Sequence, residues 1–192
     1  GSSGRGVLGP SPSPGGGATP AADLGTFSVV SGGTNTYWGS LSVGKYSQNS
    51  SVSSDTRIIF GGGTPYASPW PVTDAMDYKA MASDGNTNDF GNLTDARRAL
   101  TAFSSSTRGI FVAGVEPSSI NIIDYVEIST VGNALDFGDC INAGRHQESG
   151  CSSPTRGLFI HGNPANANYI ETVEIASKGN TTKFGNRMFN GG

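Results

Sequence analysis

The sequence predicts an all-β fold built from four copies of one unit, and three observations support this expectation. The first is an internal repeat with a period of about 48 residues, a length typical of solenoids and propellers. The second is a Thr-Arg pair that opens a short apolar run in successive units, at Arg57, Arg108 and Arg156. The third is that these runs end in small residues, mostly glycine, without helical periodicity, which indicates buried strands.

The repeat is clearest around Asp124–Ile128 and the following Gly132–Gly138. Its counterparts lie at equal distances along the chain: Asp77–Met81 with Gly85–Gly91, and Glu171–Ile175 with Gly179–Gly185. Weaker copies near the N-terminus, Gly4–Leu8 and Tyr37–Gly39, bring the number of units to four. We expect one repeat domain over residues 1–192, with units at approximately 1–46, 47–98, 99–145 and 146–192.

Each unit is predicted to contain four strands. The first begins at the Thr-Arg pair, and the second follows a polar loop of variable length, at Ala75–Met81, Ile122–Ser129 and Ile170–Ala176. A Gly-Asn pair, at 85–86, 132–133 and 179–180, then predicts a tight hairpin turn. The third strand centres on an aromatic core residue, and the fourth follows a polar connection. The aromatic residues are Trp38, Phe90, Phe137 and Phe184; the connections carry Lys45, Arg97 or Arg145; the fourth strands are Ala99–Ser104 and Gln147–Ser152.

The N-terminal region has two interpretations. Residues 1–25 are rich in glycine and proline, which is typical of a flexible leader. However, Arg5 is as far from Gly25 as Arg57 is from Asp77, so the stretch also fits a long loop inside the first unit, and we favour the loop. If the two chain ends meet, Met188 and Phe189 would supply the strand that the first unit lacks.

Composition restricts the partners. Only 14% of the residues are charged and the net charge is −3, which argues against nucleic acid, since phosphate binding needs clustered lysine and arginine. No apolar run reaches the length of a membrane-spanning helix, so no membrane insertion is expected. Cys140 and Cys151 occupy core columns of the repeat; we expect buried free thiols, with a Cys140–Cys151 bridge as the alternative.

Stacking follows from the unit itself. One thin sheet cannot bury both of its faces, so the units must cover one another. Four-stranded sheets of this length stack radially as the blades of a β-propeller. A closed ring of four blades, an arc of a larger ring completed by a second chain, and a piece of a longer parent chain all remain open.

The order of these features resembles the kelch repeat of β-propellers. Gly62-Gly63 stands at the position of the kelch glycine doublet, Tyr78 and Tyr125 lie near its tyrosine, and Trp38 lies at its tryptophan. The chain departs from the pattern where the doublet becomes Ala113-Gly114 or His161-Gly162, and where phenylalanine replaces the tryptophan. The resemblance implies a kelch-like propeller, or a partial one, over nearly the whole chain.

The recurring motifs Asp-Phe-Gly and Ser-Ser-x-Thr-Arg-Gly are also similar to repeats in structural proteins of tailed marine bacteriophages. That resemblance implies a non-enzymatic virion protein: a tail fibre, an appendage or a capsid decoration. Its expected partners are other virion proteins, copies of itself and host-surface glycans. The alternatives are a free-standing carbohydrate-binding lectin and an enzyme with a diverged active site.

One set of charged residues recurs once in each unit. Arg57, Arg108 and Arg156 open corresponding strands, and three carboxylates lie early in the next strands: Asp77, Asp124 and Glu171. These residues would either line a central channel or form arginine–carboxylate pairs that staple adjacent strands or blades. A residue required in every unit serves the unit, so the staple is the favoured interpretation.

The sequence offers no catalytic constellation. The two histidines, His146 and His161, have no triad or metal-ligand spacing around them. The calcium-like pattern at Asp84, Asn86 and Asn88 lacks the glycine and glutamate of a calcium loop. We therefore expect no catalytic residue, no metal and no cofactor.

The candidate binding site is the loop Thr64–Val72, which is longer than its counterparts. It places Tyr66 and Trp70 where the unit needs no core residue. Aromatic faces on such a loop suit a sugar ring or a partner protein. The alternative is local packing of the loop onto its own unit.

Overall fold

The structure is a computed structural model that describes residues 4–10, 21–45, 50–65, 69, 71–143, 149–160 and 169–186. Within these ranges the chain forms β-strands and no helix, which confirms the all-β prediction. Sheet 1 contains β1 (Arg5–Leu8), β2 (Ala21–Ser28) and β3 (Thr36–Lys45). Sheet 2 contains β4 (Ser50–Ser53), β5 (Arg57–Gly61), β6 (Ala75–Ala80) and β7 (Asn88–Asn92). Sheet 3 contains β8 (Thr101–Ser104), β9 (Arg108–Val115), β10 (Ser119–Glu127) and β11 (Leu135–Asp139). Sheet 4 contains β12 (Ser149–Ser152), β13 (Arg156–Ile160), β14 (Tyr169–Glu174) and β15 (Thr182–Asn186).

Each sheet is an antiparallel meander whose strands lie side by side in chain order. Sheets 2, 3 and 4 have the four strands that the repeat predicts, while the described part of sheet 1 has three. Met188 and Phe189, the expected source of a fourth strand for the first unit, lie outside the described residues. The strands predicted at Ala99–Ser104 and Gln147–Ser152 are β8 and β12, and each pairs with the arginine strand that follows it.

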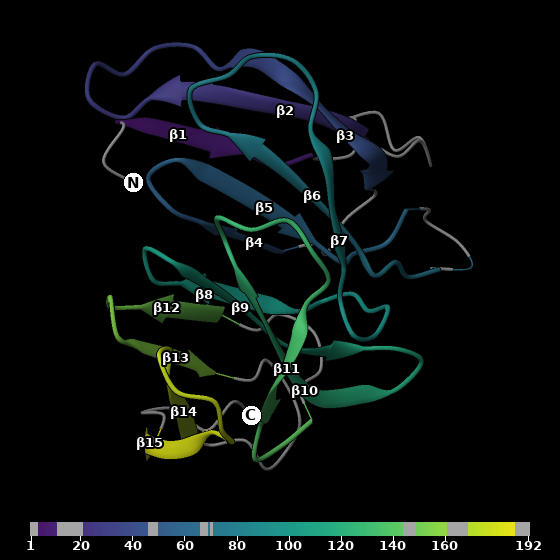
Figure 1. Ribbon diagram of the computed structural model, residues 1–192, viewed down its shortest axis with the longest axis vertical. Coiled ribbons are helices and arrows are strands. Elements are labelled where there is room, and N and C mark those ends of the chain that lie inside the picture. The colour runs from purple at the N-terminus through teal and green to yellow at the C-terminus, as the bar shows by residue number, and fades with distance from the viewer. Residues whose placement is uncertain are drawn as a thin grey trace.

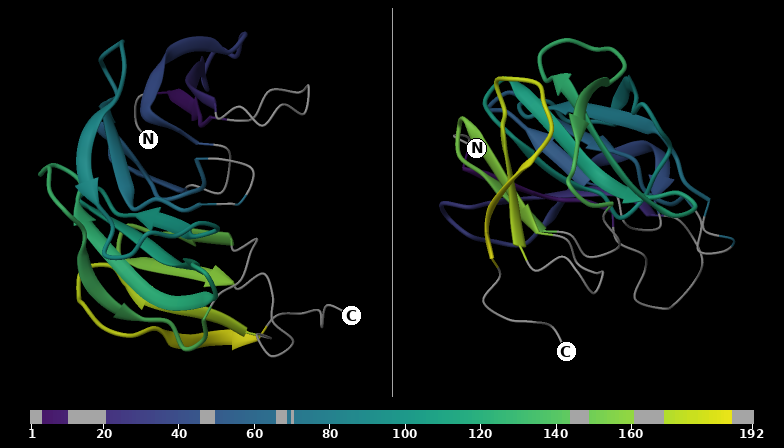
Figure 2. Two further views of the ribbon diagram at one scale, coloured as in Figure 1. Left: turned by 90° about the vertical axis from the view of Figure 1, so that its right-hand side faces the viewer. Right: turned by 90° about the horizontal axis from the view of Figure 1, so that it is seen from below.

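The four sheets follow one another along the longest axis of the molecule, with sheet 1 and sheet 4 at opposite ends (Figure 1). Seen from the side, they form an open arc (Figure 2). Among the described residues, each hydrogen bond between sheets that the structure gives joins neighbours in this series. The propeller-like arrangement of sheets is therefore present, but the described chain does not close into a ring.

The first strands of sheets 2, 3 and 4 approach one another most closely. The Ser104 hydroxyl donates to the Ser53 carbonyl at 2.8 Å, and the Ser152 hydroxyl donates to the Ser104 carbonyl at 2.8 Å. These bonds set β4, β8 and β12 next to one another. The sheets fan out from this line of serines.

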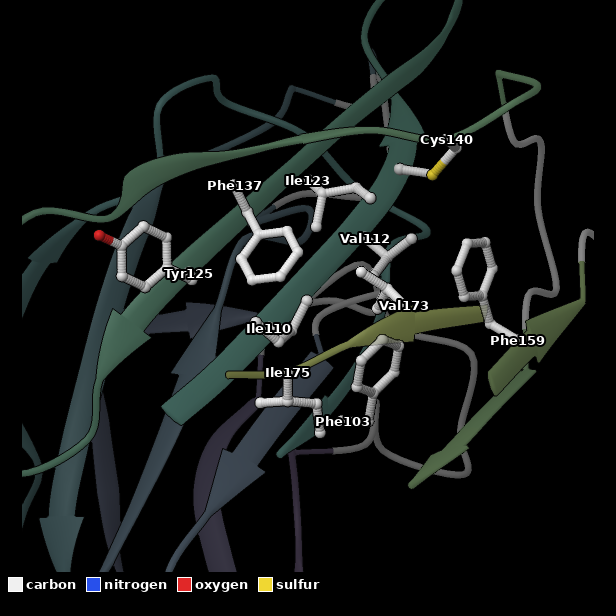
Figure 3. Close-up of a cluster of buried hydrophobic side chains, with 11 residues drawn as sticks. Phe103, Ile110, Val112, Ile123, Tyr125, Phe137, Cys140, Phe159, Val173 and Ile175 are labelled. Atoms are coloured by element: carbon white, nitrogen blue, oxygen red, sulfur yellow. The ribbon is translucent and has the colours of Figure 1, made fainter. Parts of the chain in front are cut away.

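The hydrophobic core is divided into three layers, one between each pair of neighbouring sheets. The layer between sheets 1 and 2 contains Leu24, Trp38, Leu41, Ile58, Phe60 and Met81. The layer between sheets 2 and 3 contains Val52, Ile59, Met76, Phe90, Leu93, Leu100, Phe111, Val126, Ile128 and Ala134. In the layer between sheets 3 and 4, Phe103, Tyr125 and Phe137 from sheet 3 meet Phe159, Val173 and Ile175 from sheet 4 (Figure 3).

Each sheet thus has two faces with different neighbours. We call the face turned toward the next sheet in the chain the forward face, and the face turned toward the preceding sheet the rear face. Strand alternation assigns the residues: Ile110 and Val112 of β9 point forward, while Phe111 between them points to the rear. Every internal layer therefore joins one forward face to one rear face.

Candidate functional site: the faces that join the sheets

The Gly-Asn pair connects neighbouring sheets. The Asn133 side-chain oxygen accepts the Asn92 amide of β7 at 3.0 Å, and the Ala134 amide donates to the Asn92 carbonyl at 2.8 Å. The same bonds recur between sheets 3 and 4, where Asn180 accepts the Asp139 amide at 3.0 Å. The prediction of a tight hairpin turn at Gly-Asn is therefore wrong: the pair lies in a longer connection, which extends outward because it pairs with the previous sheet.

A glycine on each outer strand makes this approach possible. Gly91 and Gly138 have φ of 130° and 146°, a region that favours glycine. A Cβ atom at Gly91 would lie 2.5 Å from the Gly132 carbonyl oxygen, and one at Gly138 would lie 2.5 Å from the Gly179 carbonyl oxygen. The recurrent Phe-Gly dipeptide therefore supplies a core aromatic residue and then the docking point for the next sheet.

A buried ion pair joins sheet 2 to sheet 3. Arg97, in the connection after β7, donates from Nη1 to Asp124 Oδ2 of β10 at 2.9 Å, and both side chains are fully buried. Asp124 also accepts the Thr94 amide at 3.0 Å and the Thr94 hydroxyl at 2.6 Å. Because the carboxylate accepts three hydrogen bonds, its charge is compensated inside the core.

The glycine doublet holds the Arg97 segment in place. Gly62 has φ of 64°, and a Cβ atom there would lie 2.7 Å from the Arg97 carbonyl oxygen. The Gly63 amide donates to that same oxygen at 2.8 Å. From sheet 3, Val115 and Arg98 exchange backbone hydrogen bonds of 2.9 and 3.3 Å. The doublet that resembles the kelch motif therefore shapes the site from which Arg97 reaches Asp124.

The equivalent pair between sheets 1 and 2 is built differently. Lys45 and Asp77 occupy the positions of Arg97 and Asp124, and both are buried. Neither the Lys45 ammonium nor the Asp77 carboxylate has a hydrogen-bond partner among the described residues. Burial lowers the pKa of Lys45 below its ordinary value of 10.5, and the negative charges of Asp77 and Asp74 oppose this shift.

The third member of the series lies between sheets 3 and 4. Glu171 is buried on β14 and accepts the Ile141 amide at 3.0 Å as well as the Thr181 hydroxyl. Ile141 stands after β11 as Thr94 stands after β7, so the carboxylate again binds the connection of the preceding sheet. Arg145, which the repeat aligns with Arg97, lies outside the described residues, as does His146.

Two of the three strand-opening arginines also join neighbouring sheets, but not through these carboxylates. Arg57 Nη1 donates to the Ile128 carbonyl of sheet 3 at 2.8 Å, and Arg108 Nη1 donates to the Ile175 carbonyl of sheet 4 at 2.9 Å. Arg108 and Arg156 pair instead with Glu127 and Glu174, at 2.8 and 2.6 Å.

The predicted pairing of Arg57, Arg108 and Arg156 with Asp77, Asp124 and Glu171 is therefore wrong, and strand register gives the reason. In the antiparallel pair of β9 and β10, Arg108 lies opposite Glu127, whereas Asp124 lies opposite Phe111. Asp124 shares the rear face with Val126 and Ile128, because side chains alternate along a strand. Because side chains alternate along a strand, the sequence places Asp124 and Glu127 on opposite faces. This was the signal that distinguishes the buried acids from the acids that pair with the strand-opening arginines.

The aromatic column behaves alike in three sheets and differently in the fourth. Trp38, Phe90 and Phe137 are buried, each by the sheet that follows. Phe184 is exposed, so the prediction of a core aromatic residue there is wrong. The physical reason is that no sheet follows sheet 4 among the described residues.

The cysteines show the same end effect. Neither cysteine forms a disulfide, so the alternative of a bridge is wrong, and Cys140 is buried in the layer between sheets 3 and 4. Cys151 is exposed, against the prediction that it is buried. It aligns with Val52 and Phe103, whose side chains are covered by a following sheet.

The described residues contain no group of three or more histidine, cysteine or acidic residues arranged to hold a metal ion, and no helix of the kind that crosses a membrane. The candidate binding residues Tyr66 and Trp70 lie outside the described residues, as does His161. The contacts that recur in the described part of the chain are those that join one sheet to the next. No protein-family model matches the sequence, and no curated protein matches it.

Proposed function

We propose that this chain is a non-enzymatic structural protein of a virus particle, such as a tail fibre, an appendage or a capsid decoration. In this role a stack of kelch-like sheets serves as a rigid support and presents loops for assembly or for attachment to a host. The observation that carries the proposal is the contrast between the two edges of the arc. At one edge the turns are nearly the same from sheet to sheet, and at the other edge the connections between strands differ in length.

The constant edge consists of the turns before the strand-opening arginines. In sheets 2, 3 and 4, a serine hydroxyl accepts the amides of the following threonine and arginine. These serines are Ser54, Ser105 and Ser153, and the hydrogen bonds to the arginine amides measure 3.3, 3.0 and 3.1 Å. The same turn is therefore repeated in three sheets.

The variable edge consists of the connections between the arginine strand and the strand after it. They run from Leu8 to Ala21, from Gly61 to Ala75, from Val115 to Ser119 and from Ile160 to Tyr169. All join corresponding strands of corresponding sheets, so they share one edge. They differ in length, and the shortest lies in sheet 3, where β9 and β10 also continue further than their counterparts. Variable loops on a constant scaffold are the usual means of presenting binding residues.

The loop that contains Tyr66 and Trp70 belongs to this variable edge. A host-surface glycan or another virion protein is the partner class that its aromatic and proline residues suit. The proposal makes the loop an attachment element and makes the serine turns part of the support.

The test is the location of the chain in infected cultures. Gradient-purified particles whose genome encodes this chain should contain it in a fixed ratio to the major capsid protein, and it should be released only by denaturants. Mass spectrometry of washed particles measures both. If the chain is absent from particles and binds a glycan array in a Trp70-dependent manner, it is a free-standing lectin and the proposal is wrong.

A further inference from the structure

The two ends of the arc expose residues whose counterparts are buried inside it. On the forward face of sheet 4, Phe184 is 54% exposed, whereas Phe90 and Phe137 are 1% and 2% exposed. On the rear face of sheet 1, Leu8 is 49% exposed, while the residues at its position in sheets 2, 3 and 4 are buried phenylalanines: Phe60, Phe111 and Phe159. Each end is therefore half of an interface that the molecule already contains three times.

The turn after β2 belongs to the same rear face. The Val29 amide donates to the Gly4 carbonyl at 2.6 Å, as Ile128 does to Thr107 and Ile175 does to Thr155, both at 2.8 Å. Val29 therefore stands where Ile128 and Ile175 stand in sheets 3 and 4. Those isoleucines are buried, whereas Val29 is 62% exposed.

The polar groups of the forward face are also in place. Arg57 and Arg108 each donate to a main-chain carbonyl of the following sheet, at Ile128 and Ile175. Arg156, the next copy, pairs with Glu174 of its own sheet and is half exposed. Its missing partner corresponds to the carbonyl of Val29 in sheet 1.

A docking glycine is present at each end. Gly185 follows Phe184 as Gly91 follows Phe90, but no atom lies within 4 Å of a Cβ atom built there. In sheet 1, Gly33 stands at the glycine of the Gly-Asn column with φ of 119°, as Gly85 does in sheet 2 with φ of 93°. In the internal layers these two positions meet: a Cβ atom built at Gly91 would lie 2.5 Å from the Gly132 carbonyl oxygen.

We propose that the forward face of sheet 4 binds the rear face of sheet 1 from a second copy of this chain, head to tail. Phe184 of one copy would pack against Leu8 and Val29 of the other, and Arg156 would donate to the Val29 carbonyl. The interface continues the internal stacking and does not depend on the proposed virion role. Because the contact is heterologous, it generates a ring if the arcs close and a filament if they do not.

This contact differs from the internal layers in one respect. Sheet 1 carries Gly25 where sheets 2, 3 and 4 carry the buried acids Asp77, Asp124 and Glu171. The interface between copies therefore lacks the acid of the buried ion pair, so apolar contacts and main-chain hydrogen bonds hold it. Such a contact forms between folded copies without first removing a carboxylate from water.

The experiment uses the 192-residue chain and two single substitutions, Phe184→Asp on the forward face and Leu8→Asp on the rear face. Sedimentation velocity over a range of concentrations measures self-association. The original chain should form dimers or larger assemblies. Each substitution should weaken association about 10- to 100-fold, since a charge replaces a large apolar side chain in the contact. Circular dichroism and thermal unfolding establish that the variants stay folded, as expected at half-exposed positions.

Mixing the two variants distinguishes head-to-tail contact from other modes. The Phe184→Asp chain keeps an intact rear face and the Leu8→Asp chain keeps an intact forward face, so the mixture should form a heterodimer that stops at two copies. Val131→Asp is the matched control, because Val131 is 51% exposed but lies away from both end faces. It should associate as the original chain does.

Three results would overturn the proposal. A chain that stays monomeric at all concentrations would mean that these faces are not covered by a second copy. Self-association of the Leu8→Asp chain at the original strength would mean that forward faces pair with each other. Equal weakening by Val131→Asp would place the contact elsewhere.

Discussion

The interface between sheets 1 and 2 and the one between sheets 2 and 3 have the same plan but differ at their buried charges. In the second, Asp124 accepts hydrogen bonds from Arg97 and from the amide and hydroxyl of Thr94. In the first, Lys45 and Asp77 are buried without a hydrogen-bond partner among the described residues. The apolar layers are similar, since each buries an aromatic residue of one outer strand against the next sheet.

The difference shows which part of the interface is essential to stacking. Sheets 1 and 2 pack together although their charged pair makes no hydrogen bonds within the described part of the chain, so the apolar layer and the outer backbone contacts hold them. Hydrogen bonding determines whether the pair adds to the stability of the layer or subtracts from it. We therefore expect sheet 1 to be the least firmly attached of the four.

The largest effect is expected from Asp124→Ala. The substitution leaves the Arg97 guanidinium buried without its partner and removes the acceptor for Thr94. We expect a loss of about 3–5 kcal/mol in the free energy of unfolding, the usual result of removing one member of a buried pair. Urea denaturation followed by circular dichroism measures this loss. Asp136→Ala on β11, where the side chain is exposed, is the control and should change the free energy by less than about 0.5 kcal/mol.

An effect of opposite sign is expected where the pair is not hydrogen bonded. The double substitution Lys45→Met with Asp77→Leu replaces two buried charges by apolar side chains of similar size. We expect a gain of about 1–4 kcal/mol in the free energy of unfolding. The matching double substitution, Arg97→Met with Asp124→Leu, should bring no such gain because the Thr94 amide and hydroxyl lose their acceptor. Equal gains in both proteins would contradict the distinction between the interfaces.

The sequence was sufficient to predict the repeat, the strands and the columns of the interface, because alternation and glycine positions are local properties. The buried aromatic residues Phe90 and Phe137 follow from the same pattern. The partners of the acids were not predicted correctly, because pairing Asp124 with Arg97 requires knowing that the segment after β7 crosses to the next sheet.

The exposure of the two end faces also could not be predicted from the sequence. Phe184 has the same local pattern as Phe90 and Phe137, yet its burial depends on a sheet that must come after it. A repeat reports what each unit needs from a neighbour and not whether the neighbour is present. The role of the Gly-Asn pair escaped prediction for the same reason, since its partners lie in the previous sheet.

The pH dependence of stability should also distinguish the two interfaces. Burial lowers the pKa of Lys45 in the folded protein below the ordinary value of 10.5 that it has in the unfolded chain. Between these two values the unfolded chain binds more protons, so the contribution of Lys45 makes the free energy of unfolding rise as the pH is raised toward 10.5. The free-energy cost of burying charged Lys45 is part of what the double substitution Lys45→Met with Asp77→Leu should recover. Denaturation at a series of alkaline pH values should show a shallower rise for Lys45→Met; an unchanged slope would contradict the burial of a charged lysine.

The smallest expected effect concerns what the interfaces share. Asn133 accepts the Asn92 amide between sheets 2 and 3, and Asn86 accepts the Ser40 amide between sheets 1 and 2 at 3.2 Å. Replacing either asparagine by alanine removes one hydrogen bond near the surface, which should cost about 0.5–1.5 kcal/mol. Asn133→Ala and Asn86→Ala should therefore lower the free energy of unfolding by similar amounts. Strongly unequal losses would mean that the outer contacts, and not only the buried charges, differ between the two interfaces.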